Sequence, residues 1–216
     1  IRLVNVTTPT SNARRVRKTP QERIREITAA TTKLIAQKGY NGLSVQDVAD
    51  EVGLTPSGVL RYVGTKKALL DLVLADDYDH TATPASFFET KLPGSDPEQP
   101  HFPAYLRYLV RENVKRSTKT RMYMMLQSES LNENHPLHNY YRQRPDKIWE
   151  LYSRYPWLIP PSIGSWDTMR SKAMQCIAAI DGLQIRYLRL PPIDLYDEWL
   201  EFERMIFPSP LWDAYR

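Results

Sequence analysis

Hydroxyl-bearing and cationic side chains gather between Thr55 and Tyr62, at spacings that suit contact with nucleic acid. An arginine can pair with O6 and N7 of guanine through two parallel hydrogen bonds, or it can hold a phosphate, and both roles are open to Arg61. The hydroxyls of Thr55, Ser57 and Tyr62 could bind backbone phosphates, and Gly58 would let the backbone approach. An arginine exposed only to solvent is the remaining interpretation of Arg61.

The surrounding residues follow the pattern of a helix-turn-helix. Two short helices that cross closely need a small residue at the crossing, a glycine at the turn and apolar residues on their inner faces. Counted from Val45, motif positions four, five, eight, nine, ten, fifteen and eighteen are Val48, Ala49, Val52, Gly53, Leu54, Val59 and Tyr62. The pattern predicts that the helix from Pro56 to Tyr62 enters the major groove of DNA, whereas a chance helical hairpin is the alternative.

Capping signals and charge support this reading. Ser44 with Asp47 resembles a capping box, and Thr55 with Pro56 is a cap followed by proline in the first turn. Residues 1–75 hold 12 Lys and Arg against 6 Asp and Glu, a net charge of +6, whereas the rest of the chain carries a net charge of −2. Clustered cations are what phosphate neutralisation requires, although an ordinary surface with chance asymmetry is also possible.

Helical periodicity recurs along the chain without strand-like alternation, so we predict an all-α fold. We expect a basic flexible arm over 1–19, a DNA-binding domain over 20–65 and a helical effector-binding and dimerisation domain over 66–216. The expected helices are 20–38, 45–52, 56–62, 66–81, 102–117, 120–131, 137–154, 166–190 and 194–207. Lys66 and Lys67 would stand in the first turn of their helix after a Thr65 cap, which favours a bound phosphate there.

Residues 22–75 resemble the TetR family of bacterial transcriptional regulators. The likeness rests on Gly39-Tyr40, on 43–49 through Gly53-Leu54, on 57–62, and on Lys66 with Leu69-Leu70. Val63 and Lys67 depart from the family pattern, which usually has an aromatic and often an acidic residue there. Stretches at 129–141 and 180–184 are similar to family members too, and the resemblance implies a helical ligand-binding and dimerisation domain. The expected DNA contacts are Arg17, Lys18, Ser44, Thr55, Pro56, Ser57, Gly58, Arg61, Tyr62 and Lys66.

Aromatic and sulfur side chains are dense in the second part of the chain. They could line an adaptable apolar cavity with a few polar groups, although at helical spacing they are more often plain core. Our candidates for contact with an aromatic or amphipathic effector are Tyr105, Tyr108, Met122, Met125, Trp149 and Tyr152.

The last two expected helices carry apolar stripes. Paired across two chains they could close a four-helix dimer interface, as the resemblance implies, or they could be buried within one subunit. The interface candidates are Leu183, Tyr187, Leu190, Trp199, Phe202, Met205 and Ile206.

Other chemistry has weaker support. His135 and His138 have a spacing that could hold a metal, but a helix-entry loop at Pro136 explains them equally well, and we expect no metal and no cofactor. Cys176, the single cysteine, is expected to pack as a small apolar group rather than to sense oxidants. We find no nucleophile motif, phosphate-cradling loop or carboxylate set, which argues against an enzyme. With no apolar run near ~20 residues and a polar start, we expect no membrane span and no signal peptide, and a cytoplasmic location.

The combination predicts a homodimeric repressor that binds double-stranded operator DNA with palindromic symmetry and is released by an unidentified small molecule. The alternative is a ligand-independent DNA-binding or architectural protein, which would lack an enclosed cavity.

Overall fold

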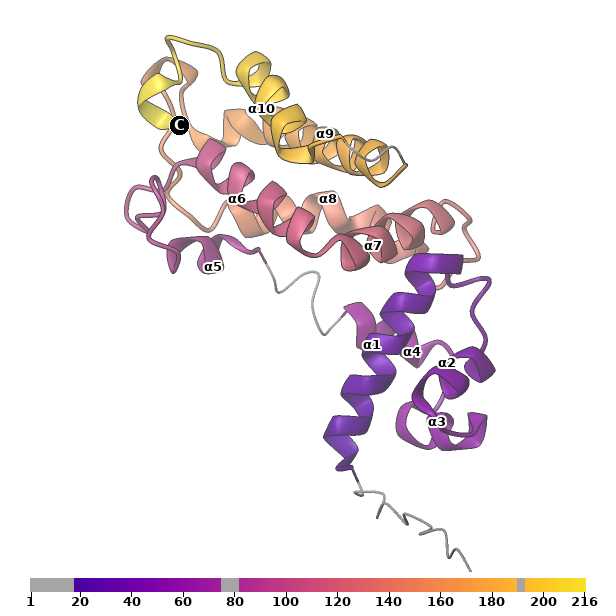
Figure 1. Cartoon of the computed structure of the whole chain (residues 1–216). Coiled ribbons are helices and arrows are strands. Elements are labelled where there is room, and N and C mark those ends of the chain that lie inside the picture. The colour runs from indigo at the N-terminus through magenta and orange to yellow at the C-terminus, as the bar shows by residue number, and fades with distance from the viewer. Residues whose placement is uncertain (1–17, 75–81, 190–192) are drawn as a thin grey trace, which may run out of the picture.

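The computed structural model describes residues 18–74, 82–189 and 193–216, and within these ranges the chain is helical without a β-strand. Two groups of helices follow one another along the chain (Figure 1). The first comprises α1 (Pro20–Lys38), α2 (Val45–Val52), α3 (Pro56–Val63) and α4 (Ala68–Val73). The second comprises α5 (Pro84–Phe88), α6 (Phe102–Lys115), α7 (Ser117–Glu129), α8 (His138–Tyr152), α9 (Arg170–Arg189) and α10 (Leu195–Ile206). Three short 3₁₀ helices, η2 (Pro161–Ile163), η3 (Trp166–Met169) and η4 (Asp213–Tyr215), lie in the connections and at the C-terminal end. The predicted all-α class is confirmed.

Local capping determines where the first three helices begin. Thr19, Ser44 and Thr55 each accept a hydrogen bond from a backbone N–H of the first turn. The capping box of Ser44 with Asp47 is present as predicted, and Asp194 caps α10 in the same manner. Because these signals are local in sequence, the bounds expected for α1 and α2 agree with the structure.

Two expectations about helix bounds are corrected. The helix expected from residue 66 begins at Ala68, because the hydroxyl of Thr65 caps the Ala68 N–H and residues 66 and 67 form the preceding turn. Its expected extension through 75–81 lies outside the described residues. The helix expected from 166 starts as the 3₁₀ helix η3 and becomes α-helical at Arg170, whereas α5 was not predicted at all.

Two hydrophobic cores hold the described chain together. The N-terminal core gathers α1 to α4 around Ile27, Val48 and Val59, and it also takes in Met122 and Leu126 from α7. The C-terminal core is built from α5, α6 and α8 to α10, with Phe102 and Trp199 fully buried. Since α7 contributes to the first core and also packs on α6 and α9, it connects the two groups of helices (Figure 1).

Candidate nucleic-acid interface and central cavity

The N-terminal end of α3 is held in place by its own polar side chains. The Thr55 hydroxyl accepts the Gly58 N–H at 3.1 Å, lies 3.1 Å from the Ser57 hydroxyl, and is followed by Pro56 in the first turn. A Cβ atom on Gly58 would lie 3.2 Å from the Thr55 hydroxyl oxygen, so glycine leaves this cap unobstructed. Thr55 and Ser57 are exposed, and Gly58 is half-buried. Two hydroxyls therefore stand at the exposed beginning of the helix.

The opposite face of α3 fastens it to the domain. Val59 has no exposed surface, and it packs with Val48 and Ala49 of α2, which are equally buried. Gly53, which ends α2, has a left-handed backbone with φ of 65° that favours glycine. The predicted helix-turn-helix is thus present, with a buried inner face and an exposed outer face on α3.

The cations of this region divide into two groups. On α1, Lys33 bonds Glu51 at 2.6 Å, and Lys38 bonds Asp47 at 2.6 Å. The Lys38 ammonium and the Ser44 capping group hold the pKa of the Asp47 carboxyl well below its usual range, so this pair stays charged. These ion pairs stabilise the packing of α1 on α2 and leave less of the α1 charge for a ligand.

The second group faces solvent around α3. Arg61 is exposed, its guanidinium lies 5.5 Å from the Tyr62 ring centre, and it forms no ion pair with the described residues. Lys66 is half-buried, with its ammonium 4.4 Å from the centre of the Tyr40 ring, and Lys67 is exposed beside it. Of the other predicted contacts, Ser44 and Lys18 are exposed, but the Ser44 hydroxyl is used in its capping box and Lys18 pairs with Glu26. Arg17 lies outside the described residues.

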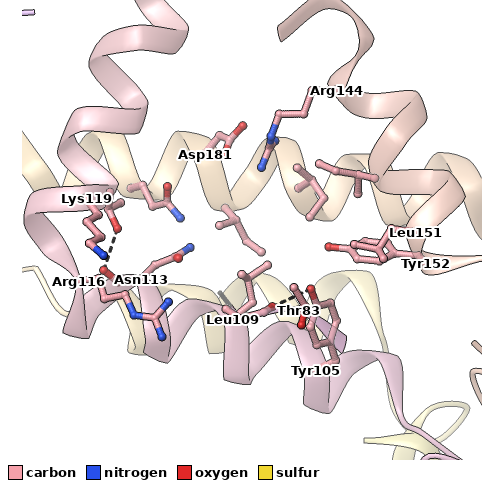
Figure 2. Close-up of a pocket in the computed structure, with 16 residues that line it drawn as sticks. Thr83, Tyr105, Leu109, Asn113, Arg116, Lys119, Arg144, Leu151, Tyr152 and Asp181 are labelled. Carbon is pink, nitrogen blue, oxygen red and sulfur yellow. Dashed lines mark hydrogen bonds between the residues drawn. The ribbon is translucent and has the colours of Figure 1, made fainter. Parts of the chain in front are cut away.

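A cavity of about 80 Å³ lies among α6, α7, α8 and α9 (Figure 2). One side carries polar groups at the junction of α6 with α7, labelled Asn113, Arg116 and Lys119. The opposite side carries the Tyr105 and Tyr152 rings, and Arg144 and Asp181 stand between the two. Further lining residues are Ala82, Thr83, Leu109, Thr120, Ile148, Leu151, Ile177, Ile180 and Gln184. The cavity is therefore amphipathic along its length.

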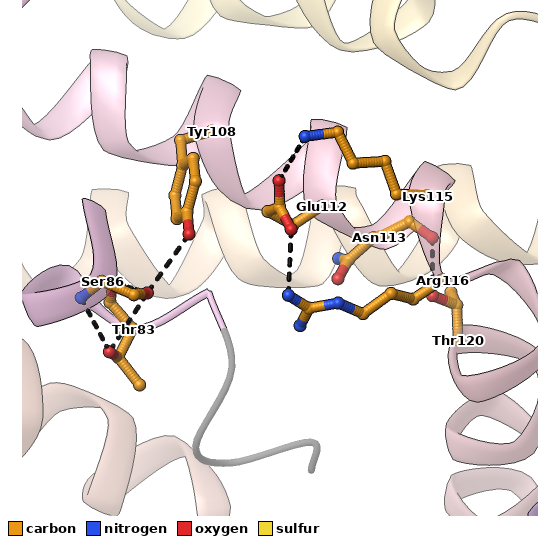
Figure 3. A network of polar contacts seen from close by, with 8 residues as sticks. All are labelled: Thr83, Ser86, Tyr108, Glu112, Asn113, Lys115, Arg116 and Thr120. Atoms are coloured by element: carbon orange, nitrogen blue, oxygen red, sulfur yellow. Dashed lines mark hydrogen bonds and ion pairs between the residues drawn. The ribbon is translucent and has the colours of Figure 1, made fainter. Parts of the chain in front are cut away.

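The polar side of this cavity is supported by α6. Glu112 accepts hydrogen bonds from Lys115 at 2.7 Å and Arg116 at 2.9 Å, which fixes the Arg116 guanidinium (Figure 3). The Thr120 hydroxyl donates to the Asn113 carbonyl at 2.9 Å and thereby joins the first turn of α7 to α6.

Burial dominates the acid–base properties of the lining groups. It raises the pKa of Tyr152 to about 12 and that of Tyr105 well above its ordinary value, so both phenols are neutral hydrogen-bonding groups at physiological pH. Burial also raises the pKa of the Asp181 carboxyl, against which the Arg144 charge and a hydrogen bond from Gln127 act.

The six residues predicted to contact the effector lie in different surroundings. Tyr105 and Tyr152 line the cavity. Tyr108 points instead to Ser86, with its hydroxyl 3.3 Å from the serine oxygen (Figure 3), and Trp149 stacks on Trp166 with ring centres 5.4 Å apart. Met122 is buried in the N-terminal core because α7 packs against α1 there, and Met125 is half-buried on α7 without lining the cavity.

Sequence reasoning missed the polar residues of the cavity, above all Gln184. Gln184 follows Cys176 and Ile180 at intervals of four residues, so it stands in the apolar register of α9. A polar residue in such a register was the one available signal, because a buried polar group needs a partner or a function.

The histidines and the cysteine have structural surroundings. His135 is buried edge-on to Tyr40 with ring centres 5.5 Å apart, and its Nδ1 accepts the Leu137 N–H at 3.2 Å. Burial lowers the pKa of His135, which disfavours its charged form. The described residues contain no group of three metal-ligating side chains. Cys176 is fully buried in the C-terminal core, as predicted.

The apolar stripes of α9 and α10 are only partly turned outward. Trp199 is fully buried within its own subunit, whereas Leu183, Tyr187, Phe202 and Ile206 are half-buried against the same core. Met205 is 73% exposed, and Leu190 lies outside the described residues. In Figure 1, α9 and α10 lie side by side at the end of the molecule opposite α3.

A carboxylate connects the two groups of helices. Glu129, at the end of α7, accepts the Tyr40 N–H at 2.8 Å and the Asn41 N–H at 3.2 Å, just after α1 ends. Together with the contact of α1 along α7, this links the helix-turn-helix to a helix that lines the cavity.

These features define a helix-turn-helix protein whose second part is an all-helical unit with an interior cavity. Residues 27–73 match the family model described as bacterial regulatory proteins, tetR family. The HTH-type transcriptional regulator YuxN of Bacillus subtilis (strain 168) is 38% identical over 71 residues. This match covers 33% of the chain and 24% of YuxN, so the chain spans about a quarter of that relative's length. The match over residues 27–73 confirms the resemblance to the TetR family that the sequence predicted for residues 22–75.

Solved structures share the fold over most of the chain. A Rhodococcus sp. protein assigned to the TetR family has a TM-score of 0.62 at 20% identity and covers 86% of this chain and 97% of its own. NalD, the secondary repressor of the MexAB-OprM multidrug efflux pump in Pseudomonas aeruginosa, has a TM-score of 0.57 at 17% identity. The alignment covers 90% of this chain and 100% of the NalD chain. No helix within the described ranges has the length and apolar character needed to cross a membrane.

Proposed function

We propose that this protein is a homodimeric transcriptional repressor that binds a palindromic DNA operator through α3 and leaves it when a small molecule enters the central cavity. The observation that carries the proposal is the outer face of α3, where Thr55, Ser57 and Arg61 are exposed on a helix whose inner face is buried. A protein acting on bacterial operator DNA would work in the cytoplasm.

The proposed contacts divide by chemistry. Arg61 is the candidate for reading a base, because its guanidinium is exposed and can pair with guanine in the major groove. The Thr55 and Ser57 hydroxyls and the Lys66 and Lys67 ammonium groups are candidates for phosphate contacts, which position the helix without specifying sequence. Two copies of this module on one dimer would read two half-sites about one helical turn apart.

The release mechanism rests on how the domains are joined. α7 contributes Lys119 to the cavity, packs along α1 and holds the start of the α1–α2 loop through Glu129. A ligand that binds one arrangement of α7 better than another would shift the relative position of the two reading helices in the dimer. A coupling of about 1–3 kcal/mol between ligand and operator would change operator affinity by about 5–150-fold.

Operator binding tests the proposal directly. A symmetric duplex is selected from a random pool, labelled, and titrated with the full-length chain by fluorescence anisotropy at several salt concentrations. Affinity should fall steeply with salt, since bound phosphates release counterions. Equal affinity for the selected and for random duplexes would refute sequence-specific regulation.

Variants separate the proposed roles. Arg61→Ala should cost about 1–3 kcal/mol and relax preference at one position of each half-site, whereas Lys66→Ala should weaken all duplexes alike and lower the salt slope. Arg142→Ala, which removes an exposed cation of α8, is the matched control and should change neither. If Arg61→Ala only weakens all duplexes uniformly, Arg61 contacts phosphate instead of a base.

A further inference from the structure

One buried amide on the cavity wall has no hydrogen-bond partner in the part of the chain that the structure describes. Gln184 has no exposed surface, and neither its Oε1 nor its Nε2 finds a hydrogen-bond partner among the described residues. It lines the cavity from α9. Burying an amide without hydrogen-bond partners is unfavourable in free energy, so a ligand group that hydrogen-bonds to it would bind favourably.

Neighbouring contacts show where this amide stands. One turn before it, Asp181 accepts a hydrogen bond from Gln127 at 3.2 Å, and one turn after it the Leu188 carbonyl accepts one from Arg121 at 3.0 Å. Both donors belong to α7, so Gln184 lies beside α7, the helix that also supplies Lys119 to the cavity.

The charged groups around the cavity are unequal in sign. Arg116, Lys119 and Arg144 line it with positive charge, and among the lining residues that the structure describes Asp181 is the one carboxylate. Glu112 offsets the charge of Arg116 from outside the cavity, at 2.9 Å. Asp181 interacts with Arg144, so the three cations together with Glu112 and Asp181 carry a net charge of +1. This excess of positive charge favours an anion over an ammonium group, and the low dielectric of the site strengthens the preference.

The opposite side suits an apolar body. Tyr105 and Tyr152 face it with neutral rings, and Leu109, Ile148 and Ile177 lie along the walls (Figure 2). The cavity volume of about 80 Å³ is below the roughly 150 Å³ at which an engineered protein cavity binds benzene, so a ligand with a benzyl group or a six-carbon chain binds when the cavity walls move outward.

From this arrangement we infer that the effector is a small amphipathic organic acid. Its carboxylate lies on the side of Lys119 and the Gln184 amide, and its apolar body packs against the Tyr105 and Tyr152 rings. Only the regulatory role of this ligand rests on the proposed function, because the ligand preference of the cavity can be measured without DNA.

Calorimetry on the full-length protein without DNA tests this preference. The probes are phenylacetate, phenylacetamide and phenethylamine, which share a benzyl group and differ in head-group charge, with hexanoate and hexanamide as an aliphatic pair. Each acid should bind on the order of tenfold more tightly than its amide, because charge-assisted hydrogen bonds are about twice as strong as neutral ones. The amine should bind more weakly than the amide. Binding of the amide or the amine as tightly as the acid, or no binding of either acid in the millimolar range, overturns the inference.

Two variants locate the head group. Lys119→Met should weaken phenylacetate binding about tenfold and bring it close to that of phenylacetamide. Gln184→Leu should weaken both, while the thermal midpoint of the ligand-free protein stays the same or rises because an unpartnered buried amide is removed. Lys147→Met is the control, since this lysine is exposed on α8 and does not line the cavity. Unchanged acid affinity in Lys119→Met and Gln184→Leu overturns the inference.

Operator release is measured separately with the same probes. If phenylacetate binds as expected but leaves operator affinity unchanged, the proposed release mechanism fails and the cavity preference stands. If phenethylamine releases the operator and phenylacetate does not, the cavity preference fails and the proposed function stands.

Discussion

Gly39 stands where α1 meets the end of α7, and replacing it with alanine should be unusually destabilising. Its backbone has φ of 73° and ψ of 173°, a region adopted almost only by glycine, so any side chain there costs about 1–3 kcal/mol. A Cβ atom would also lie 2.2 Å from Oε1 of Glu129. The glutamate could move away only by giving up its bonds to the N–H groups of Tyr40 and Asn41, at 2.8 and 3.2 Å.

The magnitude follows from these two contributions. A hydrogen bond to a charged group is worth about 1.5–3 kcal/mol, so the loss of one or both adds to the backbone strain. Gly39→Ala should therefore lower the free energy of unfolding by about 2.5–6 kcal/mol if one bond is lost and by more if both are lost, against a typical total of about 5–15 kcal/mol. Gly64→Ala is the matched control, because Gly64 also has a positive φ, 78°, but a Cβ atom there would meet nothing within 4 Å. It should lose only the strain, about 1–3 kcal/mol.

Urea unfolding followed by far-ultraviolet circular dichroism measures both variants. In a Glu129→Ala background the clash is absent, so Gly39→Ala should then cost about as much as Gly64→Ala. Equal losses for Gly39→Ala and Gly64→Ala in the otherwise natural chain would refute the role of Glu129. So would a loss for Gly39→Ala that persists undiminished in the Glu129→Ala background.

Three further predictions concern the C-terminal unit. Burial raises the pKa of Glu203, and Arg107 opposes this from 3.1 Å, so Arg107→Met should raise that pKa further. The resulting loss of stability, about 2–4 kcal/mol, should be small below the raised pKa of folded Glu203 and should grow as the pH rises above it, because Arg107 stabilises only the ionised carboxylate. Adding Glu203→Gln should abolish this pH dependence, and its persistence would exclude Glu203 as the source. Cys176 is fully buried and its pKa is raised to about 12, so a thiol reagent at pH 8 should label it only after unfolding, whereas rapid labelling of the folded protein would contradict that burial. Met205→Glu should dissociate the proposed dimer in analytical ultracentrifugation, whereas Leu131→Glu, at an 83% exposed position between α7 and α8, should not; equal behaviour would place the interface elsewhere.

Local signals in the sequence predict most of the N-terminal helices correctly. The bounds of α1 and α2 depend on Ser44 with Asp47 and on glycines at 39 and 53, all within a few residues of the helix ends they determine. Capping residues act through local backbone hydrogen bonds, so their effect does not depend on packing against distant parts of the chain. The helix-turn-helix and the exposed candidates on α3 were predictable for the same reason, because the spacing of residues along one helix determines which of them share a face.

Only the tertiary structure decided which residues surround the cavity. Periodicity shows that Tyr105 and Tyr108 both lie on an apolar side of α6, but which of them faces α8 depends on how the two helices are rotated against each other. Met122 was assigned to the wall of a cavity, and instead it is buried in the N-terminal core, because α7 packs along α1. Gln184 became informative only when its burial and its unpartnered amide were known. The physical reason is that contacts between residues far apart in sequence form the cavity walls. The periodicity of a sequence indicates which face of a helix is buried, but it does not indicate which other helix packs against that face.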